Sequence, residues 1–132
     1  MVYLSLCIAI PVTFLSSEIV GILYGLAYEG AAEVLVVHIW TGVFVFLGVA
    51  SQQWFIAEHK ERLALYRTAA GMIVNVGLNL LLIPKYQAVG AAWATLISQA
   101  IAALFFDLVN KETWPMFGMK MRALLLRRLL HV

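Results

Sequence analysis

The sequence predicts an all-α integral membrane protein with four transmembrane helices. Hydrophobic residues make up 64% of the 132 residues and charged residues 12%, with a mean hydropathy of +0.93. Soluble domains are roughly 45 to 50% apolar and about 25% charged. Charges and turn residues divide the chain into four apolar segments. A transmembrane helix takes about 20 residues, so residues 1–108 have room for four helices, and residues 109–132 form a basic cytoplasmic tail.

The first two segments are expected at residues 2–23 and 31–57. The apolar N-terminal segment lacks the positive start and the small-residue cleavage site of a secretory signal, which favours a membrane helix. Pro11 should kink it, because a proline ring removes a backbone hydrogen bond and clashes with the preceding turn. The second segment is longer than a bilayer core requires, so it must tilt or protrude.

The third and fourth segments are expected at residues 68–83 and 88–107, after a charged connection over residues 58–67. Pro84 should end the third segment, and residues 85–87 should form a tight turn into the fourth. The two segments together form a helical hairpin whose apolar run is broken mainly by small residues and amides. Carboxamides inside hydrocarbon indicate a packing or transport role.

The distribution of Lys and Arg predicts the orientation, because positive charge is retained on the cytoplasmic side of a membrane. With the N-terminus inside, eight of the nine basic residues are cytoplasmic, and Lys85 lies outside. Both termini are therefore expected in the cytoplasm. This strong bias, together with a Glu18 near an interface, disfavours a small multidrug transporter that inserts in both orientations.

Several function classes are disfavoured by composition. Cys7 is the one cysteine of the sequence, and no Cys or His spacing resembles a metal site. Paired carboxylates, a His cluster, a nucleophile elbow and a Gly-rich phosphate loop are all missing from the sequence, so neither catalysis nor a cofactor is expected. The basic residues lie at segment ends, where lipid headgroups explain them better than nucleic acid does.

The candidate path residues are polar groups within the apolar segments. Asn75 and Asn79 are four residues apart and share one helix face, and Gln99 lies near mid-depth of the fourth segment. These amides either line a hydrated cavity that receives a polar headgroup or bind a neighbouring helix. Gln52 and His38, toward opposite ends of the second segment, have the same two interpretations.

Small residues recur every four positions along the fourth segment at Gly90, Ala94, Ser98 and Ala102. This small-xxx-small pattern lets two helix backbones approach closely, so these residues are expected to pack helices. Asp107 closes the segment, and Lys111 is expected to neutralise it one turn later. The basic, Leu-rich tail from Met119 is expected either to lie on lipids of the inner leaflet or to fray into the cytosol.

The order of four motifs resembles that of a known family. These motifs are Ser16-Ser-Glu18 with Tyr24-Gly25, the pair Asn75 and Asn79, Ile83-Pro-Lys-Tyr86, and Gly90-Ala-Ala92. Over residues 1 to about 110 the chain resembles the C-terminal part of bacterial polysaccharide flippases of the O-antigen type, in the multidrug, oligosaccharidyl-lipid and polysaccharide exporter superfamily. Members often carry Gly where this chain has Gln87, so its turn lacks the residue best suited to a left-handed conformation.

The resemblance implies a two-lobed transporter of twelve helices, of which this chain would be the last four. It implies alternating access in a bacterial inner membrane, with a lipid-linked oligosaccharide as substrate and membrane lipids and the remaining helices of the transporter as partners. A drug or lipid-precursor exporter of the same superfamily is the alternative, as is a four-helix assembly or scaffold protein. Eight further spans before Met1 would favour the transporter, and a true start there would favour an oligomeric four-helix protein.

Overall fold

Helices account for all the regular structure in the residues that the computed structural model describes, 2–109 and 111–124. The all-α prediction is confirmed in that part of the chain. The long helices are α1 (Val2–Tyr24), α2 (Ala31–Ala57) and α3 (Glu61–Ala100). Shorter elements are the 3-10 turn η1 (Leu26–Tyr28), the π-helical segment η2 (Ile101–Phe105), α4 (Phe106–Val109), the 3-10 turn η3 (Lys111–Thr113) and α5 (Trp114–Leu124).

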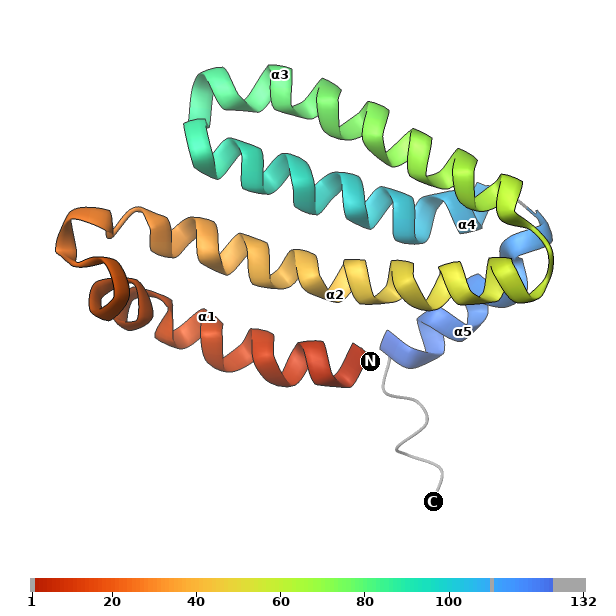
Figure 1. Cartoon of the computed structure of the whole chain (residues 1–132), viewed down its shortest axis with the longest axis horizontal. Helices are drawn as coiled ribbons and strands as arrows, with labels where there is room; N and C mark the ends of the chain where they lie inside the picture. Colours follow the sequence, from red (N-terminus) through yellow and green to blue (C-terminus); the bar gives the residue numbers. More distant parts are fainter. Residues whose placement is uncertain (1, 110, 125–132) are drawn as a thin grey trace.

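Helix α3 consists of two rods that lie antiparallel (Figure 1). The reversal is at Gln87, whose backbone angles of φ 51° and ψ −127° are not helical. We refer to residues 61–86 as the first rod and to residues 88–100 as the second rod. A straight helix of 40 residues would be about 60 Å long at 1.5 Å per residue, and the reversal folds this length into a hairpin.

The first rod of this hairpin extends beyond both ends of the predicted transmembrane segment, residues 68–83. The helix begins at Glu61 rather than at residue 68, because charged side chains do not prevent a helix and an acidic residue in the first turn complements its dipole. Pro84 does not end the first rod, since helical structure continues through it to the reversal at Gln87. Prolines are tolerated in membrane helices where neighbouring groups satisfy the freed backbone atoms.

Small residues bring the two rods of α3 together. A Cβ atom on Gly71 would lie 2.9 Å from the Ala102 Cβ, so the first rod approaches η2 closely at that point. Nearer the reversal, a Cβ on Gly90 would lie 2.5 Å from the Leu82 carbonyl oxygen and 3.1 Å from the Tyr86 Cβ. Backbone atoms cannot yield as a flexible side chain can, so the hairpin requires glycine at position 90.

Helix α2 occupies the centre of the bundle, with α1 along one side and the α3 hairpin along the other (Figure 1). Trp40 Nε1 donates to Thr13 Oγ1 at 3.1 Å and joins α2 to α1. The buried core comprises Val2, Ala9, Val43, Leu47 and Ala103, with Leu6, Ile39 and Phe44 packed against it. It thus draws on α1, α2 and η2, which come from both ends of the sequence.

The outer faces of the rods are apolar. Ile22 on α1 is 84% exposed and Leu80 on α3 is 73% exposed, and other large hydrophobic side chains share these faces. Among the described residues, three segments are long and apolar enough to cross a membrane: Val2–Tyr24, Ala31–Ala57 and Glu61–Leu108. The exposed faces and these segments together describe a multi-pass membrane protein.

Gly90→Ala should destabilise the hairpin by about 1 to 3 kcal/mol, the usual cost of forcing an extra carbon into a packed site. Gly77→Ala is the matched control, because a Cβ there meets no atom within 4 Å. Thermal unfolding in detergent, followed by circular dichroism, measures both variants. Equal midpoints for the two would contradict the close approach at Gly90.

Gln87→Gly should stabilise the protein by about 1 kcal/mol, because a non-glycine residue at positive φ carries strain of order 1 to 3 kcal/mol and glycine adopts this region freely. The same substitution at Gln53, an exposed amide within α2, should cost about 0.5 to 1 kcal/mol. The same unfolding measurement compares them. A lower midpoint for Gln87→Gly would show that the turn is unstrained.

Candidate functional site

A chain of hydrogen bonds joins polar side chains across the α3 hairpin. Asn79 Nδ2 donates to Asn75 Oδ1 at 2.9 Å, and Asn75 Nδ2 donates to Ser98 Oγ at 3.1 Å. Ser98 Oγ in turn donates to the Thr95 carbonyl at 2.9 Å. The i, i+4 spacing of the two asparagines places them in contact, and Ser98 reaches them because small residues keep the rods close. The structure therefore brings Asn75 and Asn79 together with the second rod.

One atom of this chain has no partner among the described residues. Asn79 Oδ1 is buried and accepts no hydrogen bond. A buried acceptor without a donor costs about 1 to 3 kcal/mol, so this oxygen is the atom of the hairpin best placed to receive a further donor. Gln99 lies next to Ser98 in sequence and is half-buried on the second rod.

The four small residues of the second rod and η2 have different neighbours. Gly90 lies against Leu82, Ser98 binds Asn75, and Ala102 lies against Gly71. Ala94 is completely buried. The three contacts all join the second half of the hairpin to the first rod.

A second polar group lies between α2 and the first rod of α3. Arg67 is buried, and its Nη2 donates to the Gly48 carbonyl at 3.2 Å and to Gln52 Oε1 at 3.3 Å. Its guanidinium carbon lies 5.3 Å from the centre of the Phe55 ring, a distance at which a cation and an aromatic face attract. Gln52 therefore holds an arginine of the protein itself, rather than standing alone in the bundle.

Asp107, completely buried at the end of the bundle, pairs with Lys120 of α5. Lys120 Nζ donates to Asp107 Oδ2 and to the Ala103 carbonyl, the latter at 2.6 Å. Burial lowers the pKa of Lys120, and its hydrogen bond to Asp107 opposes that shift. The prediction that Lys111 neutralises Asp107 is wrong. Lys111 is exposed in η3, where the chain turns, and α5 brings Lys120 to Asp107 instead.

The contacts of Arg67, Asp107 and Lys120 cannot be predicted from their spacing in the sequence. Arg67, Asp107 and Lys120 are 40 and 13 residues apart, so only the folded path of the chain brings them together. The signal in the sequence is that Arg67 and Asp107 border apolar segments, where charged side chains need partners. That signal identifies the residues as unusual but leaves the pairing open.

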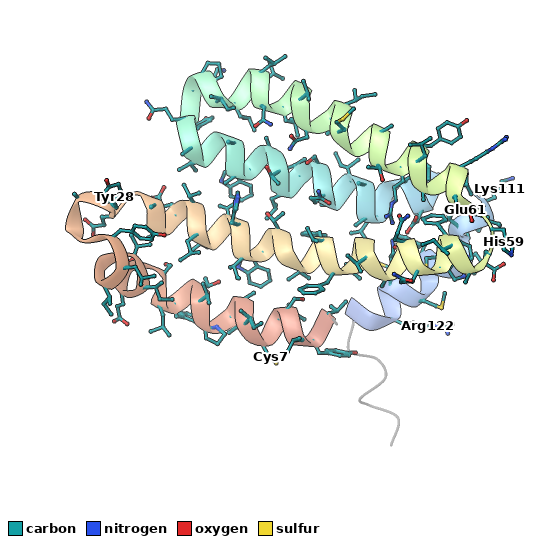
Figure 2. The ribbon with its side chains drawn as sticks, viewed as in Figure 1. Cys7, Tyr28, His59, Glu61, Lys111 and Arg122 are labelled. Carbon is teal, nitrogen blue, oxygen red and sulfur yellow. The ribbon has the colours of Figure 1, made fainter. Side chains whose placement is uncertain are left out.

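His38 lies apart from both groups. It is exposed on α2 and lines an open groove of about 440 Å³. The other lining residues are Ile19, Val20, Leu23, Tyr24, Tyr28, Ala31, Val34 and Leu35, all from α1, η1 and α2. Figure 2 shows Tyr28 at one end of the bundle, with His59, Glu61 and Lys111 at the opposite end. The structure thus does not join His38 to the asparagines.

In the described part of the chain, no three His, Cys, Asp or Glu side chains are grouped to hold a metal ion. The polar groups that the described residues do assemble are amides, hydroxyls, the Arg67 guanidinium and a buried ion pair. Such groups bind polar ligands and join helices.

Comparison with protein families matches residues 1–132 to the family described as lipid II flippase MurJ. The chain belongs to the MurJ family. A relative named as a probable low-salt glycan biosynthesis flippase, Agl15 of Haloferax volcanii, is 33% identical over 105 residues. This alignment covers 74% of the chain and 21% of the relative, so the chain spans about a fifth of the length of that protein. No solved structure matches.

Membership of the MurJ family confirms the resemblance to glycan flippases. It also identifies the chain as part of a transporter family rather than of an enzyme family. It does not by itself assign a role to any side chain of the hairpin.

In this MurJ-family hairpin, the Asn75 to Ser98 hydrogen bond should contribute about 0.6 kcal/mol, the average for such bonds between membrane helices. A double-mutant cycle with Asn75→Ala and Ser98→Ala measures this coupling from unfolding free energies in detergent. The control cycle pairs Asn75→Ala with Ser17→Ala, an exposed serine of α1. Coupling no larger than in the control would contradict the hydrogen bond.

Proposed function

We propose that the chain supplies the last four transmembrane helices of a flippase that moves a lipid-linked glycan across the cytoplasmic membrane. Two findings support the proposal: the match to the MurJ family extends over all 132 residues, and the relative in Haloferax volcanii is named as a glycan biosynthesis flippase. In this proposal α1 and α2 are the first two passes and the two rods of α3 are the last two. The remaining helices of the transporter complete the cavity.

The proposed topology has both termini in the cytoplasm of a bacterium, with the Gln87 reversal outside. The charge distribution supports it, since Lys85 is the one basic residue near the reversal and the other eight lie toward the opposite side of the membrane. Exposed charged residues at that opposite end, among them Glu61 and Lys111, agree with an interface to water and headgroups (Figure 2). Arg127 and Arg128 of the tail lie outside the described residues.

The observation that carries the proposed role of the hairpin is that Asn79 Oδ1 is buried without a hydrogen-bond partner among the described residues. A glycan headgroup is rich in hydroxyl donors and cannot enter hydrocarbon without compensating hydrogen bonds. An amide oxygen held inside the bundle, with its own NH₂ group fixed on Asn75, is preorganised to accept such a donor. Asn75, Gln99, Gln52 and His38 complete the set of residues that we propose along the path.

The alternative roles differ in what the asparagines do. In a scaffold, Asn75 and Asn79 serve packing alone, and the bond from Asn75 to Ser98 favours that role for Asn75. An exporter of drugs or lipid precursors uses the same helices for a substrate with fewer hydroxyl groups. Glycan export and protein abundance, measured in the same cells, separate these alternatives.

Asn79→Leu should reduce glycan export by about tenfold while leaving the amount of protein in the membrane unchanged, because tenfold corresponds to one lost hydrogen bond of about 1.4 kcal/mol. Asn75→Leu should reduce export and also lower abundance, since it breaks the bond to the second rod. The assay follows surface glycan in cells that depend on the transporter carrying this chain.

Gln53→Leu is the matched control, because it removes an exposed amide of α2 and should change neither quantity. Unchanged glycan export in Asn79→Leu at normal abundance would remove Asn79 from the path. Loss of the protein itself would assign Asn79 to packing.

A further inference from the structure

The buried cluster of Asp107, Lys120 and Arg67 contains two cations and one anion. Asp107 Oδ2 binds Lys120, while Asp107 Oδ1 is buried without a hydrogen-bond partner in the described residues. Arg67 Nη1 is likewise buried and unpartnered there. Gly71 meets Ala102 where the first rod lies against η2, and in the antiparallel hairpin Arg67 and Asp107 lie about one helical turn beyond that contact, on the same side of it. No ion pair joins Arg67 to Asp107 among the described residues. Asp107 therefore has a second cation nearby that it does not yet bind.

Helix α5 is attached to the bundle in two different ways. Its start is fixed by neutral hydrogen bonds, from Thr113 Oγ1 to the Asp107 carbonyl at 2.9 Å and from Trp114 Nε1 to the Leu108 carbonyl at 3.0 Å. Further along, Lys120 crosses to Asp107 and Ala103. The first attachment involves Thr113, the last residue of η3, and Trp114, the first residue of α5, so it can act as a hinge. The second attachment must break if α5 moves away.

The helix that receives Lys120 is locally modified at the contact. Ala103 lies within η2, where the Phe106 N–H binds the Ile101 carbonyl, five residues back. π-Helical segments interrupt the regular hydrogen-bond ladder and frequently mark functional positions. Here the segment presents the Ala103 carbonyl to Lys120 Nζ at 2.6 Å. The lysine thus occupies a position shaped for it rather than pairing at the protein surface.

We propose that Asp107, Lys120 and Arg67 form a releasable latch, in which Asp107 exchanges Lys120 for Arg67 when α5 swings away from the bundle about η3. The exchange keeps the buried carboxylate paired in both states. This matters because a buried charge that loses its partner is strongly destabilising. An element with two paired arrangements can switch, whereas one with a single arrangement cannot. The latch is independent of the transported substrate.

The packing of α5 against the bundle can be followed at Met116, which lies on α5 and is 5% exposed. A cysteine at this position, in a Cys7→Ser background, should react slowly with a water-soluble maleimide in isolated membranes. Lys120→Met and Asp107→Asn should each raise the reaction rate by about tenfold or more. The reason is that a buried ion pair changes the equilibrium between α5 packed on the bundle and α5 released from it by at least that factor. Arg122→Met, which removes an exposed cation of the same helix, should leave the rate unchanged. Equal rates for Lys120→Met and Arg122→Met would overturn the latch.

The partner exchange is tested by protein abundance in the membrane. Lys120→Met alone should keep most of the normal amount of protein in the membrane, because Arg67 replaces the lost cation. The double variant Lys120→Met with Arg67→Met should have a much lower abundance than the product of the relative abundances of the two single variants. Adding Asp107→Asn to that pair should restore abundance by removing the unpaired charge. Multiplicative effects in the double variant, or loss of the protein in Lys120→Met alone, would show that Arg67 does not take over Asp107.

Discussion

Lipid offers no hydrogen bonds, so a polar side chain carried into an apolar rod needs a partner from the protein. In this bundle the serine and threonine hydroxyls mostly bind carbonyls of their own helix, whereas several longer side chains find their partner on another rod or helix. Trp40 binds Thr13 between α2 and α1, Arg67 binds Gln52 between α3 and α2, and Asn75 binds Ser98 within the hairpin. Because the surrounding faces are uniformly apolar, these few bonds determine which sides of the helices meet.

Short polar side chains meet across a helix pair when the backbones are close, and small residues provide that closeness. At Gly71 and Gly90 the rods of α3 leave no room for even one extra carbon, and this spacing lets Ser98 reach Asn75. Longer side chains join elements that are further apart, as Lys120 and Arg67 do. The length of each polar side chain thus matches the gap that it bridges.

Much of this arrangement follows from sequence patterns. The apolar segments, the reversal near Gln87 and the contact between Asn75 and Asn79 depend on local spacing, which a sequence displays directly. The partner of Asp107 does not, because the 3-10 turn η3 redirects the chain between Asp107 and Lys120. The nearest cation in sequence, Lys111, is carried outward by the same turn. Pairings across irregular segments depend on the path of the backbone, which residue spacing alone does not give.

The two polar clusters differ in the freedom that the fold allows them. The asparagine cluster lies within one hairpin, closed by a short reversal and held by small residues, so its atoms keep fixed relative positions. The Asp107 cluster joins α5 to other elements through long side chains, and Arg67 Nη1 has no hydrogen-bond partner among the described residues. A transporter needs both kinds of region, since a polar headgroup requires a preorganised partner while alternating access requires elements that change contacts. In this chain the rigid cluster lies in the hairpin interior, and the exchangeable one lies where α5 meets the bundle.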